Sequence, residues 1–89
     1  MSKLTPAAGN VLVELNKYHK RHEMMPSRAE LAAIMGYESP NSIQIFIVKI
    51  EKLGYIKTIK GVSRAITITP LGKTIASHAA LKAHMKGLQ

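Results

Sequence analysis

The sequence predicts a mainly α-helical domain that carries one small β-hairpin. Three observations support this prediction. Residues that cap helices stand directly before prolines at Thr5-Pro6, Ser39-Pro40 and Thr69-Pro70, and proline is favoured at the first helical position. Apolar residues follow these starts with helical spacing. Between Gly54 and Pro70 the apolar period changes from about 3.6 to about 2, which is typical of extended strands.

The first two helices follow from capping residues and from glycine and proline stops. We expect the first helix to run from about Pro6 to Glu23, because Pro26 disfavours helical backbone at Met25. The apolar residues of this helix are Ala8, Val11, Leu12, Leu15 and Tyr18. Ser27 and Glu30 have the spacing of a capping box and predict a short second helix that Gly36 ends. Its inward residues are expected to be Leu31, Ile34 and Met35.

The third helix is expected to begin at Pro40 and to end at Gly54. Its core face should consist of Ile43, Phe46, Ile47, Ile50 and Leu53. Residues 55–60 and 64–69 then predict two strands joined by a short connection over residues 61–63, with a twist or bulge where Ile56 and Ile59 alternate poorly. A fourth helix should run from Pro70 to near Met85.

Two helices joined by a short turn that contains glycine form a helix-turn-helix, and a hairpin directly after the second of them is a wing. The predicted fold is therefore a winged helix-turn-helix with three helices, a two-stranded wing and an extra C-terminal helix. We assign residues 1–69 to this domain and residues 70–89 to a C-terminal helix that serves dimerisation or packing.

Length and composition exclude several classes of protein. The chain has 89 residues, which suits one compact domain with a thin stability margin. It has no cysteine, so disulfides and thiolate metal sites are excluded. No apolar run approaches the roughly 20 residues of a membrane span, and the N-terminus lacks the apolar region of a signal peptide. We therefore expect no membrane partner and a cytoplasmic, nucleoid-associated location.

Charge is distributed unevenly along the chain. The formal net charge is +8, yet all the acidic residues lie at or before Glu51, and the sequence from Lys52 to the end has seven basic residues and no acidic one. Such a one-sign segment attracts polyanions, of which nucleic acid is the first candidate. A basic protein without a nucleic-acid partner is the alternative.

The side of the third helix opposite its core face is the predicted recognition surface. Amide side chains can bridge the edge of adenine, and hydroxyls can contact base edges or phosphates. The predicted base contacts are Ser39, Asn41, Ser42, Gln44 and Ile45. Ser39 should also cap the helix, and capping alone is the alternative for Asn41. The predicted contacts to the DNA backbone or minor groove are Arg28, Lys49, Lys52, Lys60, Ser63 and Arg64, the last three from the tip of the wing.

Two apolar residues, Ile45 and Val48, project from the polar side of the third helix in this phasing. They could contact thymine methyl groups, they could form a protein contact, or the helix could be misphased. In the last helix, an apolar stripe with many alanines suits close packing, either on its own first helix or on a second subunit of a homodimer. The candidate dimer or partner interface consists of Val48, Leu71, Ile75, His78, Leu81 and Met85.

No pattern of residues indicates a cofactor, a metal site or catalysis. His19 and His22 are three apart, but no carboxylate lies at a supporting spacing, and we interpret the histidines as surface residues. No nucleophile motif is present. We therefore expect a protein that is not an enzyme.

The sequence resembles the DNA-binding domain of the LexA repressor family from Leu4 to about Ile66. The resemblance rests on the segments 26–32, 36–37 and 39–42, followed at the family's spacing by 54–56 and 61–64. It implies a winged helix that binds a palindromic operator as a dimer, with base contacts from the start of the third helix. Ser39, Asn41 and Ser42 match positions that the family uses, and Gln44 stands where the family has an acid.

The sequence also departs from the family's pattern. Ile45 replaces a polar contact residue, so the operator need not be the family's. The chain ends without the family's self-cleaving protease domain, and we expect no self-cleavage. The entry to the fourth helix, residues 69–73, is more similar to small winged-helix regulators of the MarR type.

The leading hypothesis is a sequence-specific, double-stranded DNA-binding transcriptional regulator of the repressor kind, encoded by a phage or mobile element. The alternative is a protein-interaction module on the same fold that binds a host transcription factor or polymerase.

Overall fold

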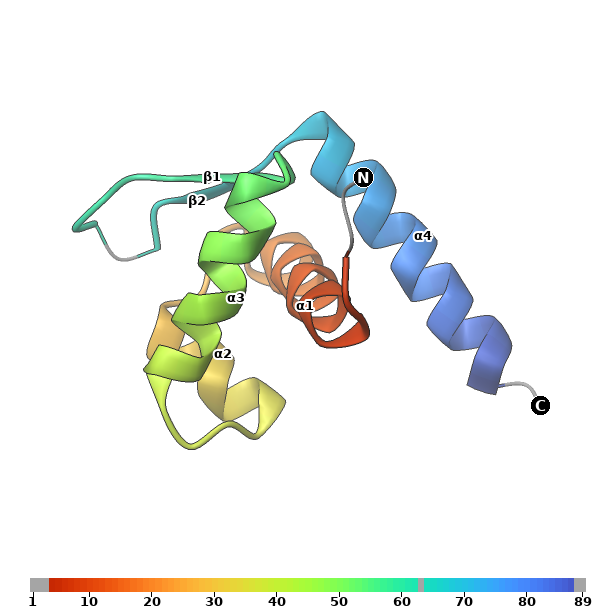
Figure 1. Cartoon of the computed structure of the whole chain (residues 1–89), viewed down its shortest axis with the longest axis horizontal. Helices are drawn as coiled ribbons and strands as arrows, with labels where there is room; N and C mark the ends of the chain where they lie inside the picture. The colour runs from red at the N-terminus through yellow and green to blue at the C-terminus, as the bar shows by residue number, and fades with distance from the viewer. Residues whose placement is uncertain (1–3, 63, 88–89) are drawn as a thin grey trace.

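The computed structural model describes residues 4–62 and 64–87, and in the last helix it describes side chains as far as Ala79. The elements occur in the order α1 (Pro6–His22), α2 (Arg28–Met35), α3 (Pro40–Lys52), β1 (Ile56–Thr58), β2 (Ile66–Ile68) and α4 (Pro70–Gly87). Figure 1 shows α1 at the centre, with α2 and α3 on one side of it, α4 on the other and the hairpin extending away from α3. The predicted winged helix-turn-helix is confirmed.

The helices begin where the capping residues predict. The Thr5 side chain accepts a hydrogen bond from the backbone N–H of Ala8, with Pro6 at the first helical position. At α2, Ser27 Oγ accepts the N–H of Glu30 at 3.1 Å and the Glu30 carboxylate accepts the N–H of Ser27 at 2.8 Å, so the capping box is present. These contacts satisfy N–H groups that have no partner within the helix.

The turn between α2 and α3 depends on Gly36. Its backbone φ of 78° lies in the left-handed region, which a residue without Cβ adopts at little cost. The N–H of Tyr37 then bonds to the carbonyl of Ala32 at 2.8 Å and closes the helix end. This turn sets the direction in which α3 leaves α2.

One hydrophobic core joins all four helices to the hairpin. Its fully buried large side chains are Val11, Leu12, Leu15, Leu31, Ile43, Ile47, Ile50 and Ile56. Burial of apolar side chains of this size supplies most of the stability of so small a domain.

Ile34 does not face the core, which corrects the prediction for α2. Its side chain is 50% exposed, whereas Leu31 and Ala32 are buried and Met35 packs against the core. At about 100° per residue, Leu31, Ala32 and Met35 point in similar directions, and Ile34 lies about 100° away from their mean. The spacing of three residues between Leu31 and Ile34 therefore does not place Ile34 on the core side of this helix of 8 residues.

The strands are shorter than predicted, with three residues each instead of six. They pair antiparallel with Ile56 opposite Ile68 and Thr58 opposite Ile66, which places all three isoleucines among the buried residues. Residues 59–65 form the wing tip, not a three-residue connection: the N–H of Val62 bonds to the carbonyl of Ile59, and the N–H of Ala65 to that of Val62. Ile59 is 64% exposed because side chains alternate along the strand, and it lies on the outward side with Lys57 although its N–H still bonds to the carbonyl of Ala65 at 3.1 Å.

Candidate nucleic-acid interface

The outer face of α3 presents Asn41, Ile45, Val48, Lys49 and Lys52 to solvent. Their spacing of three and four residues places them on one side of the helix. The opposite side carries the buried isoleucines at 43, 47 and 50. The predicted orientation of α3 is confirmed, and the possibility that Ile45 and Val48 belong to the core is excluded, because they are 66% and 41% exposed.

The N-terminus of α3 combines one capping residue with one exposed amide. Ser39 Oγ accepts the backbone N–H of Asn41 at 3.1 Å, so the predicted cap is present. The Asn41 side chain is exposed, whereas Ser39 and Ser42 are half-buried. Asn41 is therefore the most accessible amide at the end of α3 that adjoins the turn.

Gln44 is half-buried and meets another predicted contact residue. Its side-chain oxygen accepts a hydrogen bond from Arg28 Nε, which links the start of α2 to α3. This bond orients both side chains before any ligand is present. Sequence spacing gave no signal for it, because the two residues are 16 apart in the chain.

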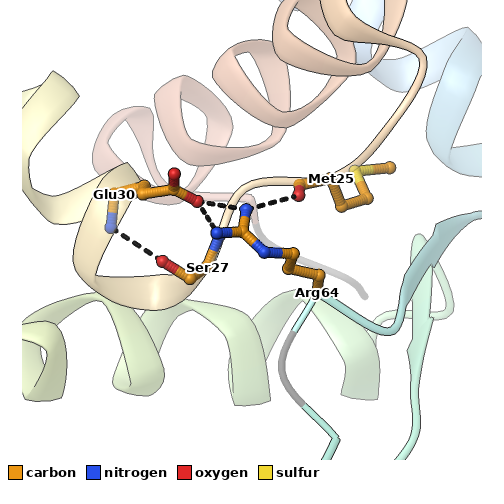
Figure 2. Close-up of polar contacts among 4 residues, drawn as sticks. All are labelled: Met25, Ser27, Glu30 and Arg64. Atoms are coloured by element: carbon orange, nitrogen blue, oxygen red, sulfur yellow. Dashed lines mark hydrogen bonds and ion pairs between the residues drawn. The ribbon is translucent and has the colours of Figure 1, made fainter.

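The tip of the wing carries two cations, Lys60 and Arg64, and the side chain of Arg64 points back to the body. Lys60 is exposed beside Gly61. Arg64 has a left-handed φ of 66°, and its guanidinium donates to the Glu30 carboxylate and, at 3.4 Å, to the Met25 carbonyl (Figure 2). Ser63, the other predicted wing contact, lies outside the described residues.

Glu30 is the residue of this region whose second partner sequence analysis missed. Its carboxylate completes the capping box and also forms an ion pair with Arg64. The hydrogen bond from Arg64, followed by that from the backbone of Ser27, lowers the pKa of Glu30 from 4.5 to about 2. Spacing revealed Glu30 as a capping residue, but a contact 34 residues away leaves no periodic signal.

A second acid holds the end of β1 that leads into the wing tip. The Glu51 carboxylate, near the end of α3, accepts the backbone N–H of Thr58 at 2.8 Å and the Thr58 hydroxyl at 2.9 and 3.0 Å. Charge-assisted bonds of this kind are among the stronger hydrogen bonds in proteins. The end of β1 is therefore fixed to the helix whose outer face is the candidate interface.

The predicted interface on α4 divides between two environments. Leu71 is 53% exposed and His78 is exposed, whereas Ile75 packs against the core of its own chain. The side chains of Leu81 and Met85 lie outside the described residues. In its described part, α4 packs on α1 and buries Gly72 and Ala76, of which Gly72 lies against the backbone of Tyr55.

The described part of the chain has neither a metal site nor a membrane-spanning helix. No group of three His, Cys, Asp or Glu side chains within it is placed to hold a metal ion. None of its helices is long and apolar enough to cross a membrane.

A helix-turn-helix whose second helix is followed by an antiparallel hairpin defines the winged helix-turn-helix class of domains. Within that class, residues 1–65 match the family model described as the LexA DNA binding domain. The chain belongs to this family. The resemblance predicted from the sequence is thereby confirmed.

Individual relatives agree with the family match. The chain is 34% identical to a LexA repressor of Pseudomonas aeruginosa over 68 residues, which are 76% of this chain and 33% of the relative. It is 39% identical to a LexA repressor of Alcanivorax borkumensis over 67 residues, 75% of this chain and 33% of the relative. The match to LexA repressor 1 of Pseudomonas putida is 32% over 71 residues, 80% and 35% respectively. The chain thus spans about a third of the length of these relatives.

Proposed function

We propose that this protein binds double-stranded DNA sequence-selectively and represses transcription by occupying its operator. The observation that carries the proposal is the outer face of α3, which presents an exposed amide and two lysines on the helix that follows the turn. Family membership and the net charge of +8 support the same conclusion. The relatives named above are repressors, which supports repression as the regulatory sense.

In this proposal α3 enters the major groove by its N-terminal end. A helix of 13 residues is about 20 Å long, and the groove, about 12 Å wide, admits an α-helix. Asn41 and Gln44 then contact base edges, with Ser39, Ser42 and Ile45 beside them. Arg28, Lys49, Lys52 and Lys60 contact phosphates, which fix the position of the domain without specifying sequence.

Substitution of Asn41 tests the proposal most directly, because its exposed side chain makes no described contact that folding requires. Asn41→Ala should weaken binding to the operator by about 1–3 kcal/mol, which is about five- to 150-fold, and leave binding to random DNA nearly unchanged. Gel shifts with the DNA upstream of the protein's own gene, at two salt concentrations, measure both quantities.

Asn10→Ala is the matched control, since Asn10 is an exposed amide on α1. It should leave both affinities unchanged. Equal losses on operator and random DNA for Asn41→Ala would contradict the assignment of Asn41 to base contact.

We further propose that two copies bind a palindromic operator, with the exposed part of α4 as their contact. Leu71 and His78 lie seven residues apart and so on one side of α4, and both are exposed. Two-fold dimers are the commonest assembly and match two half-sites on DNA.

One observation favours a second candidate function. The exposed pair Ile45 and Val48 forms an apolar patch on α3 that a protein partner, such as a host transcription factor, could cover. Ile45→Glu would then abolish capture of that partner and leave DNA binding intact, whereas loss of DNA binding alone supports the first proposal.

A further inference from the structure

The wing tip has little packing of its own to hold it against the body. Ladder pairing ends at Thr58 and Ile66, and Ile59, Lys60 and Val62 are exposed. Among the described residues of the tip, Arg64 is the one whose side chain hydrogen-bonds outside the wing. Glu51 fixes the end of β1 to α3, and beyond Thr58 the position of the tip relative to α2 depends strongly on the Arg64 side chain.

The acceptor that Arg64 meets is itself fixed in place. Glu30 is in the first turn of α2, and its carboxylate already accepts the N–H of Ser27 within the capping box. Figure 2 shows the guanidinium of Arg64 between this carboxylate and the carbonyl of Met25, a residue of the segment that directly precedes α2. The contact thus joins the wing to the first element of the helix-turn-helix.

We propose that Arg64 is a positioning residue, and that its ion pair with Glu30 sets the angle of the wing so that Lys60 can reach the DNA backbone. This inference rests on the proposed DNA binding. It departs from the sequence-based prediction that Arg64 itself contacts DNA. If the guanidinium left for a phosphate, Glu30 would face a polyanion as an uncompensated negative charge, which is unfavourable.

Glu30→Gln separates the two roles, because glutamine retains an acceptor for the N–H of Ser27 and keeps the capping box. If Arg64 contacted DNA, loss of a nearby acid would tighten binding. If Arg64 positions the wing, Glu30→Gln should weaken operator binding by about two- to fivefold, the range available to a partly exposed ion pair. Arg64→Ala should weaken it equally, and the double variant should bind no worse than either single one.

The salt dependence of binding provides a second readout. In Glu30→Gln and Arg64→Ala the wing still reaches its bound position at a cost in affinity, and Lys60 keeps its phosphate contact in the complex, so the slope of log affinity against log salt should stay unchanged. The slope should fall by about one in Lys60→Ala, which removes that contact. Glu38→Gln is the matched control: Glu38 is an exposed acid in the turn before α3, and its loss should leave binding unchanged or slightly tighter.

Wing mobility can be followed without DNA. Trypsin should cleave after Lys60 faster in Glu30→Gln than in the wild type or in Glu38→Gln. If the wild type failed to bind the operator while this cleavage difference appeared, DNA binding would be refuted and the wing contact would stand. Tighter binding by Glu30→Gln, or a slope reduced by Arg64→Ala, would overturn the inference. The inference would also be overturned if Glu30→Gln and Arg64→Ala lowered the melting temperature but left the affinity for the operator unchanged at a temperature where every variant is folded.

Discussion

Ile45 is the residue that most distinguishes the candidate interface chemically, because it places an apolar side chain among polar and basic ones. Its side chain is 66% exposed, between the exposed amide of Asn41 and the lysine at position 49. The apolar group that the major groove offers is the C5-methyl group of thymine. On the proposed function, Ile45 selects thymine at the position that it contacts.

Replacing single thymines of the operator by uracil tests this selection, since uracil lacks only the methyl group. At the contacted position the wild type should lose about fourfold in affinity, from the roughly 0.8 kcal/mol of one buried methyl-sized group. In Ile45→Ser the difference between thymine and uracil should disappear. Competition gel shifts measure these ratios.

Ile34→Ser is the control, because Ile34 is a similarly exposed isoleucine on α2. It should respond to uracil as the wild type does. If no thymine of the operator were sensitive to uracil, Ile45 would have no role in base selection, and the protein-partner hypothesis would gain support.

Glu30 links the stability of the domain to pH. Its pKa is about 2 in the folded protein, lowered chiefly by the hydrogen bond from Arg64, against 4.5 ordinarily. A folded-state pKa below the unfolded one contributes stability that is complete above about pH 4.5 and is lost as the pH falls toward 2. The difference in melting temperature between the wild type and Glu30→Gln should therefore shrink across that window. A difference that is constant from pH 7 to about 2 would contradict the ion pair.

At the scale of elements, the junction of α4 with the rest of the fold depends on Gly72. A Cβ at this position would lie 1.9 Å from the Tyr55 carbonyl oxygen and 2.8 Å from its carbon. The same oxygen accepts the N–H of Thr69 at 3.0 Å, and the Thr69 hydroxyl donates to the Gly54 carbonyl at 2.8 Å. The start of α4 thus lies directly against the backbone that follows α3.

Gly72→Ala should destabilise the protein by about 1–3 kcal/mol or more, because backbone atoms cannot move aside as a flexible side chain does. Gly9→Ala is the matched substitution in α1. Its Cβ would lie 3.5 Å from Leu4, an ordinary contact, and alanine favours helix by up to about 1 kcal/mol. In urea unfolding, the free energy of unfolding should fall in Gly72→Ala and rise in Gly9→Ala relative to the wild type. Equal changes in the two variants would refute the close approach at Gly72.

The sequence predicts the helices better than the wing, and the reason is physical. Helix starts depend on local groups such as Thr5, Ser27 and Ser39, whose hydrogen bonds reach only two or three residues. The strands were predicted too long because the extended residues flanking them have the same composition as strands. Their ends depend on where pairing stops, which is a property of both strands together.

In the candidate interface, too, features set by local spacing could be predicted and contacts between residues distant in the sequence could not. The outer face of α3 could be predicted from the spacing of Ile43, Ile47 and Ile50, since the face opposite a core is free. The Arg28–Gln44 and Glu30–Arg64 contacts could not, because each joins residues brought together only by the fold. Two cations predicted to contact DNA thus have protein partners.

On the scale of the whole molecule, α4 gives the domain its elongated form, with extents of 41 × 27 × 24 Å. Figure 1 shows α4 leaving the body on the side of α1 that is away from the wing. A second copy contacting α4 would therefore leave α3 and the wing accessible. This arrangement is compatible with two subunits on adjacent half-sites.

The proposed homodimer can be tested by the mass of the free protein and by the number of chains bound to DNA. Sedimentation of the free protein should show a mass that rises with concentration. Sedimentation with a palindromic operator whose half-sites lie about 10 base pairs apart should show two chains per DNA molecule. Leu71→Glu, which places a charge on the exposed part of α4, should weaken both the self-association of the free protein and the binding of two chains to the palindrome. Lys73→Glu, on another side of that helix, should leave the free protein's self-association unchanged; a monomer at all concentrations would contradict the proposal.

The two acids that hold the wing have a consequence for anyone who would strengthen this protein's affinity by raising its charge. Of the five acidic residues, Glu30 and Glu51 bind wing residues, whereas Glu23 and Glu38 are exposed. Neutralising the exposed pair adds positive potential at no structural cost. Neutralising Glu30 or Glu51 would remove contacts that hold the wing in place. Substitutions that make the chain more basic should therefore leave these two residues unchanged.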